Sequence, residues 1–140
     1  MVDSHTEGLD VFKEMMPGLI PDNVTSLRDG GFADELGDLS IDHVFGAMWT
    51  RPGLDRRSRS LVTLGALIAL RANDELKYHF PIALRNGLSM EEIEEVIYHM
   101  AGYAGYPRCR HRAQCRTRSI GKLIRAIAMT KAAAAKGLTC

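Results

Sequence analysis

Residues 49–60 read Trp-Thr-Arg-Pro-Gly-Leu-Asp-Arg-Arg-Ser-Arg-Ser, and a long apolar segment follows them. Pro52-Gly53 forces a turn, and Asp55 or Ser58 can cap the helix that begins after it. Leucine and isoleucine then recur at one-turn intervals, at Leu61, Leu64, Leu67 and Ile68, and Val62, Ala66 and Ala69 widen this stripe. The pattern predicts a helix that is apolar nearly all round, and we expect such a helix to lie centrally in the fold.

The remaining signals are also helical. Residues 10–16 predict a short helix ended by Pro17-Gly18, and Ser40 is a candidate N-cap for a helix through about Trp49. Asp74 is a candidate cap for a helix to Asn86, with Gly87 at its C-terminal end. Ser89 and Glu92 have the spacing of a capping box. Because strand signals are nearly absent, we expect an all-α fold whose two middle helices form a central antiparallel hairpin.

Charge divides the chain unevenly. Residues 1–107 carry nine Lys/Arg and 17 Asp/Glu, a net charge of −8, whereas residues 108–140 carry nine Lys/Arg and no acid. The acidic body repels phosphate, so we do not expect nucleic acid as a partner. No apolar run reaches 18 residues, which predicts no membrane association and a cytoplasmic protein. The length fits a single domain spanning residues 1–140, with 108–140 as a basic, atypical C-terminal segment.

The basic C-terminal segment has three competing interpretations. It is a helix that packs on acidic surface, a polyanion-binding tail, or the product of a reading-frame change near residue 108. A helix is predicted over residues 119–136. The segment also holds Cys109, His111 and Cys115. Three such ligands within seven residues suggest zinc, but the spacing matches no finger pattern and a fourth ligand is not apparent, so we expect no metal.

The ordered set of motifs resembles the carboxymuconolactone decarboxylase family. The set comprises residues 49–60, the apolar helix, His79, Asn86-Gly87, residues 92–99, and the element Tyr103-Ala-Gly-Tyr-Pro107. The resemblance implies an AhpD-like, carboxymuconolactone decarboxylase-like helical domain that assembles as a homo-oligomer, commonly a trimer or hexamer. It also implies a carboxy-lyase of aromatic-acid catabolism that converts gamma-carboxymuconolactone to an enol-lactone and CO2. We expect no cofactor.

His79 is the first candidate for catalysis. It lies at the edge of the stripe formed by Leu76, Phe80 and Ala83. A partly buried structural histidine is one interpretation, and a proton donor is the other, since imidazole titrates near neutral pH. The resemblance favours the second, because His79 matches the family's Leu-x-x-His element. Pro81 departs from the family pattern, so either the helix starts near Pro81 or a kink re-aims His79.

Glu95 and His99 form an i, i+4 pair on the next predicted helix. They form either an ion pair at the surface or at a subunit contact, or a pair in which the Glu95 carboxylate orients His99 as a second candidate acid. Four arginines stand close together at Arg51, Arg56, Arg57 and Arg59. They are a solvated cluster, or a pocket in which Arg51 binds a substrate carboxylate. Trp49 either walls that pocket or packs in the core.

One branch of the superfamily is not expected. The peroxidase-related branch uses a Cys-x-x-Cys pair before the shared histidine and a glutamate one helix earlier. These positions fall on Ala72, Glu75 and Ser60 here. Without a thiol there is no nucleophile for peroxide, so we do not expect thiol-dependent peroxidase activity. Two alternatives stay open: an enzyme of the same fold acting on another lactone or cyclic carbonyl compound, and a non-catalytic oligomeric binding protein.

Overall fold

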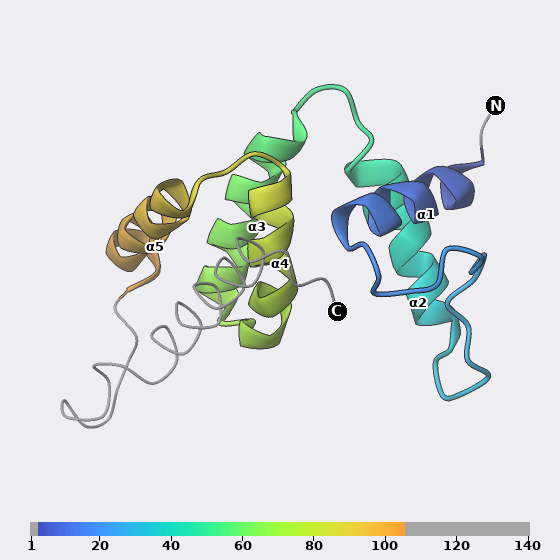
Figure 1. Cartoon of the computed structure of the whole chain (residues 1–140). Helices are drawn as coiled ribbons and strands as arrows, with labels where there is room; N and C mark the ends of the chain where they lie inside the picture. Colours follow the sequence, from blue (N-terminus) through green and yellow to red (C-terminus); the bar gives the residue numbers. More distant parts are fainter. Residues whose placement is uncertain (1–2, 106–140) are drawn as a thin grey trace. The chain divides into compact units, whose positions relative to one another are not determined.

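The computed structural model describes residues 3–105, and every regular element in that range is helical (Figure 1). The elements are α1 (Ser4–Met15), α2 (Glu35–Ser40), the π-helix η1 (Ile41–Met48), α3 (Arg56–Leu70), α4 (Asn73–Arg85) and α5 (Met90–Ala104). The prediction of an all-α fold is confirmed. The chain forms two compact units, residues 1–60 and the part from Leu61 onward, and each is described by itself. The single domain stays a prediction, and the predictions for residues 108–140 concern residues outside the described range.

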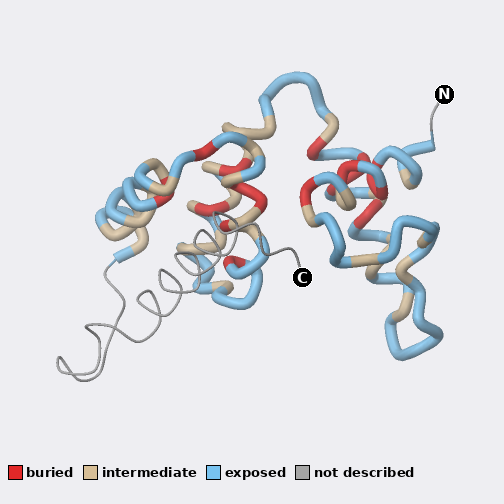
Figure 2. The backbone as a smooth tube through the Cα atoms, in the orientation of Figure 1, coloured by how far each residue is buried: buried red, intermediate tan, exposed pale blue. Residues whose placement is uncertain are grey.

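The first unit is built on a close crossing of α1 and η1. A Cβ placed on Gly8 would overlap the carbonyl oxygen of Ile41, and one placed on Gly46 would overlap the carbonyl oxygen of Ser4. The two helices therefore meet backbone against backbone, which only glycine permits at these positions. Apolar side chains close around the crossing, and Phe12 and Phe45 meet edge to face with ring centroids 4.9 Å apart. The buried members are Leu9, Val11, Met15, Ile41, Phe45 and Trp49. Figure 2 colours the buried parts of the chain red.

The helix before Trp49 begins earlier than the sequence indicates. It starts at Glu35 as α2 and continues into η1, so Ser40 lies inside it in a right-handed helical conformation and makes no capping bond. The prediction of Ser40 as an N-cap is therefore wrong. In η1 the hydrogen bonds reach back five residues, as in the 3.0 Å bond from the Trp49 N–H to the Val44 carbonyl. Such π-helical segments are rare and occur frequently at functional sites.

Two side chains of α1 hold the irregular segment that follows it. Lys13 Nζ donates to the carbonyls of Asp22 and Val24, at 2.7 and 2.9 Å. His5 lies 2.6 Å (Nδ1) from Asp42 Oδ1 and 2.9 Å (Nε2) from the Thr25 carbonyl oxygen. Both partners of His5 are acceptors, so both ring nitrogens donate only when the imidazole is protonated.

The stability of the first unit should therefore fall as His5 loses its proton. The hydrogen bonds to Asp42 and to the Thr25 carbonyl raise the pKa of His5 above 6.5. A raised native-state pKa stabilises the fold fully below the unfolded-state pKa, and this stabilisation disappears as the pH rises through the native-state value. We expect the urea midpoint to fall as the pH rises above 6.5 and through the raised native-state pKa of His5, and to fall less in His5→Gln. His43→Gln, which changes an exposed histidine of η1, is the matched control. An equal fall in wild type and His5→Gln would contradict the prediction.

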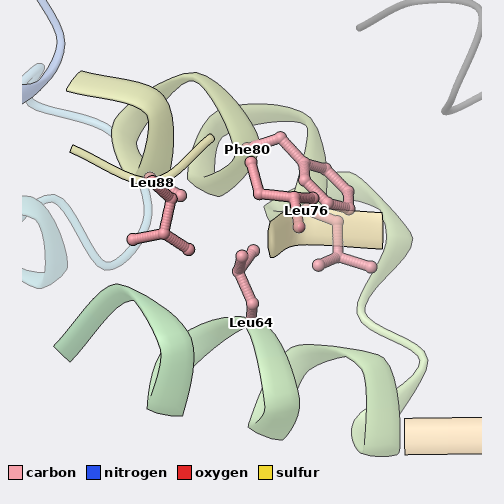
Figure 3. Close-up of a cluster of buried hydrophobic side chains, with 6 residues drawn as sticks. Leu64, Leu76, Phe80 and Leu88 are labelled. Carbon is pink, nitrogen blue, oxygen red and sulfur yellow. The ribbon is translucent and has the colours of Figure 1, made fainter. Parts of the chain in front are cut away.

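The second unit has one apolar core between α3, α4 and α5. The buried residues are Leu64 of α3, Leu76, Phe80 and Ala83 of α4, Leu88 of the connection, and Ile93 of α5. Figure 3 shows Leu64 rising from α3 toward the side chains of Leu76, Phe80 and Leu88. The predicted stripe is confirmed, because Leu61, Leu67 and Ile68 pack against this cluster. The reversal between α3 and α4 falls at Arg71, whose φ is +57°.

The helix α3 is less enclosed than its composition predicts. Val62 is 65% exposed and Leu70 is 75% exposed, and Ala66 and Ala69 are exposed as well. In the described part of the chain, only one face of α3 is covered. An apolar face of α3 is therefore open among residues 3–105, and the central position of this helix stays a prediction.

The connection between α4 and α5 follows the predicted signals. The Gly87 N–H donates to the Leu84 carbonyl and the Leu88 N–H to the Ala83 carbonyl, at 3.1 and 3.0 Å, with Gly87 at φ +94°. This pair of bonds is a Schellman motif. Ser89 and Glu92 then form the complete capping box of α5. Asp74, in contrast, does not cap α4: it pairs with Lys77 at 2.6 Å, and the N-cap position is Ala72.

Among residues 3–105, no helix combines the length and the apolar character that crossing a bilayer requires.

Candidate functional site

His79 lies on α4 at the boundary between the core and solvent. Leu76, Phe80 and Ala83 of the same helix are buried in the core cluster, and His79 is half-buried beside them. The 3.6-residue period explains this position, because residues 76, 80 and 83 share one face and residue 79 stands at its margin. The imidazole is therefore partly shielded from water.

Burial is the main influence on the protonation of His79. It lowers the pKa of the imidazole below 6.5, and the carboxylate of Glu75, one turn earlier on α4, partly offsets this effect. Desolvation disfavours the charged form of any histidine. His79 is consequently mostly neutral at neutral pH, and its protonated form is a stronger acid than an exposed histidine.

Pro81 stands inside α4, two residues after His79. The helix runs from Asn73 to Arg85 through the proline, so the alternative in which it starts near Pro81 is wrong. Proline has no N–H, so the carbonyl of Lys77 lacks its usual partner four residues later. His79 therefore sits within a helical turn that is one hydrogen bond short.

Glu95 and His99 lie on the exposed side of α5. The His99 ring packs against Tyr103, with centroids 4.7 Å apart and planes 36° apart. Within the described residues, no hydrogen bond or ion pair joins Glu95 to His99. The neighbouring carboxylate, Glu94, accepts a 2.8 Å bond from the Tyr98 hydroxyl. The observed neighbour of His99 is therefore an aromatic ring and not the Glu95 carboxylate.

Trp49 and Arg51 belong to the first unit and differ sharply in exposure. Trp49 is 7% exposed and packs in the core of that unit, which favours its structural interpretation. Arg51 is exposed two residues later. Its guanidinium makes no hydrogen bond or ion pair with the residues that the structure describes. Arg51 thus presents a charge that is available to an anion.

Arg59 supports the beginning of α3 through a contact with the preceding turn. Its Nη2 donates to the carbonyl of Arg51 at 2.7 Å, which links the beginning of α3 to the turn before it. No sequence signal marks a contact between side chain and backbone across eight residues.

The five candidates thus divide between the units, with Trp49 and Arg51 in the first and His79, Glu95 and His99 in the second. A metal-binding group of three or more His, Cys, Asp or Glu side chains is not found between residues 3 and 105.

Comparison with known proteins supports one family. The sequence model of the carboxymuconolactone decarboxylase family matches residues 34–115. A 4-carboxymuconolactone decarboxylase of Acinetobacter baylyi is 35% identical over 104 residues, which cover 74% of this chain and 76% of that protein. A nitrosuccinic acid decarboxylase of Metarhizium robertsii is 38% identical over 104 residues, which cover 74% of this chain and 71% of that protein. The chain therefore belongs to the carboxymuconolactone decarboxylase family.

Proposed function

We propose that this protein is a carboxy-lyase that removes CO2 from a carboxylated small molecule without a cofactor. Two relatives, each covering about three quarters of this chain, are named as decarboxylases, and this is the observation that carries the proposal. The half-buried His79, with its lowered pKa, supports it, because proton transfer is the one chemical step that a side chain must supply.

We propose gamma-carboxymuconolactone, also called 4-carboxymuconolactone, as the substrate. The bond between the ring carbon and its carboxylate breaks, CO2 leaves, and the electron pair moves through the adjacent double bond to the lactone carbonyl oxygen. A proton then adds to a ring carbon to give the enol-lactone. The conjugated lactone is its own electron sink, so the protein needs to bind the substrate, stabilise the developing negative charge and deliver one proton.

His79 is the proposed proton donor. The charges of a bound carboxylated substrate raise the pKa of a neighbouring imidazole, because an anion stabilises the protonated form. Substrate binding would thus counteract the lowering of the His79 pKa by burial, and the imidazole would be protonated in the substrate complex. His99, whose ring packs against Tyr103, is the second candidate for the acid.

Arg51 is the proposed anchor of the substrate carboxylate that remains after CO2 is lost. The support is its exposure and the absence of a competing partner within residues 3–105. Guanidinium groups bind carboxylates through two parallel hydrogen bonds. Trp49, buried two residues before Arg51, would help to position this turn.

An open-chain nitro acid is the second candidate substrate. The relative that favours it is the nitrosuccinic acid decarboxylase, which is 38% identical to this chain. A nitro group stabilises the carbanion left by CO2 as well as a conjugated lactone does, so the same binding and proton-donating residues would serve. The same binding and proton-donating residues would also serve another lactone or a cyclic carbonyl substrate.

The test is CO2 release by the purified full-length protein from gamma-carboxymuconolactone and, separately, from nitrosuccinate. We expect turnover of the lactone, with KM raised roughly 10- to 100-fold in Arg51→Met and kcat changed much less, because one charge-assisted anchor is removed. Turnover of nitrosuccinate without turnover of the lactone would identify the nitro acid as the substrate and exclude gamma-carboxymuconolactone. No CO2 from either compound, with the protein folded, would overturn the decarboxylase proposal.

We also propose that the protein assembles as a trimer or hexamer. The exposed apolar face of α3, which includes Val62 and Leu70, supports assembly because such a face is costly to leave in water. Sedimentation of the full chain measures the oligomeric state directly.

A further inference from the structure

Three arginines near the turn between η1 and α3 have different surroundings. Arg56 Nη1 lies 2.7 Å from Glu14 Oε2 and ties the start of α3 to α1. Arg59 Nη2 donates to the Arg51 carbonyl oxygen at 2.7 Å. Arg51 makes no hydrogen bond or ion pair through its own guanidinium within the described residues. These residues are therefore not an undifferentiated patch of charge.

The backbone of this turn is held at both ends. At its far end, Asp55 accepts hydrogen bonds from the Ser58 N–H and from the Ser58 hydroxyl, both at 2.9 Å, and so caps α3. At its near end, the bond from Arg59 fixes the carbonyl of Arg51. Pro52 adds stiffness directly after Arg51, because its ring fixes φ. The main chain of Arg51 is thus constrained while its side chain remains in solvent.

The burial of Arg59 shows which of its contacts matters. The side chain is half-buried, and its Nε is buried without a partner among the described residues. An unsatisfied buried donor destabilises a fold. An apolar side chain would cover the same surface without that penalty. The favourable contribution of Arg59 therefore comes from its charge-assisted bond to the Arg51 carbonyl.

We propose that Arg59 is a positioning residue that acts through Arg51. By holding the carbonyl of Arg51, it fixes the direction in which the Arg51 side chain leaves the backbone, and so aims the exposed guanidinium at a carboxylate of the substrate. This inference rests on the proposed role of Arg51 as the substrate anchor. It assigns to Arg59 no contact with substrate.

The test is a double-mutant cycle on the full-length protein. KM and kcat for CO2 release are measured for wild type, Arg51→Met, Arg59→Met and the double variant. We expect Arg59→Met to raise KM severalfold with kcat nearly unchanged, and to have no further effect on KM once Arg51 is methionine. Arg59→Lys, which keeps a charged donor, should restore most of the wild-type KM. Arg56→Met removes a neighbouring arginine whose partner is Glu14, and is the matched control with an unchanged KM.

A binding measurement keeps the test independent of turnover. The dissociation constant of succinate, a simple dicarboxylate, is measured by calorimetry for the same variants. It should follow the same pattern as KM, even if the true decarboxylation substrate is a different compound.

Three results would overturn the inference. Equal effects of Arg59→Met with and without Arg51 would mean that the two residues act independently. A lower melting temperature with KM and succinate affinity unchanged would mean a purely structural role. Unchanged succinate affinity in Arg51→Met would mean that Arg51 does not anchor a carboxylate. CO2 release that is absent in wild type, combined with coupled succinate binding, would instead overturn only the decarboxylase proposal.

Discussion

Replacing His79 by glutamine is expected to lower kcat for CO2 release by about 10²- to 10⁴-fold, the usual contribution of a general acid. Glutamine keeps a polar side chain of similar length at this half-buried position but cannot transfer a proton at neutral pH. The fold should survive, because the core contacts of α4 come from Leu76, Phe80 and Ala83. Circular dichroism and the melting temperature of the variant check that it does.

The pH dependence provides a second, independent view of the same role. An acid must be protonated in the free enzyme, so kcat/KM should be high at low pH and fall as the pH rises through the pKa of His79, which burial holds below 6.5. Glu75 stabilises the imidazolium, so Glu75→Gln should move this fall to lower pH. A kcat/KM that rises through the same pH range would make His79 a base. An unchanged profile in His79→Gln would transfer the role to His99.

Replacing Gly46 by alanine is expected to destabilise the first unit by about 3 kcal/mol, at the upper end of the range for overpacked sites. The added methyl group would overlap the Ser4 carbonyl oxygen, and because this is a backbone atom, α1 itself has to move. Gly8→Ala, on the facing helix, should act in the same direction through the Ile41 carbonyl. Urea unfolding followed by Trp49 fluorescence reports on this unit, since the only tryptophan lies in its core.

Gly53 offers the matched control for this substitution. It lies in the same unit, and a Cβ at this position would meet no atom within 4 Å. We therefore expect Gly53→Ala to leave the urea midpoint nearly unchanged. If Gly46→Ala were as stable as Gly53→Ala, the close approach of α1 and η1 would not be maintained in solution.

Signals that act over a few residues could be predicted from the sequence. The capping box of Ser89 and Glu92, the positive φ of Gly87 and the buried stripe around Leu64 all depend on neighbours within about two helical turns. The place of His79 at the margin of the core follows from the same helical period. These features were encoded locally, so reading the sequence was enough to find them.

Features that depend on distant backbone contacts could not be predicted. Ser40 has the residue type of an N-cap, yet a helix already begins at Glu35 and passes through it. The five-residue hydrogen bonds of η1 form where α1 crosses at Gly8 and Gly46, and nothing in residues 41–48 alone specifies that partner. The bond from Arg59 to the Arg51 carbonyl is equally invisible, because any residue has a carbonyl.

The back-to-back helix ends between α4 and α5 also bear on the order of folding. The stop signal of one helix and the start signal of the next lie within residues 86–89, so the chain closes a very short loop when it turns this corner. Short closures lose little chain entropy, and local contacts form quickly. We expect this connection to form early during refolding. The helix α4, with His79 at the margin of its buried face, would then already contact α5 when α3 packs against the core.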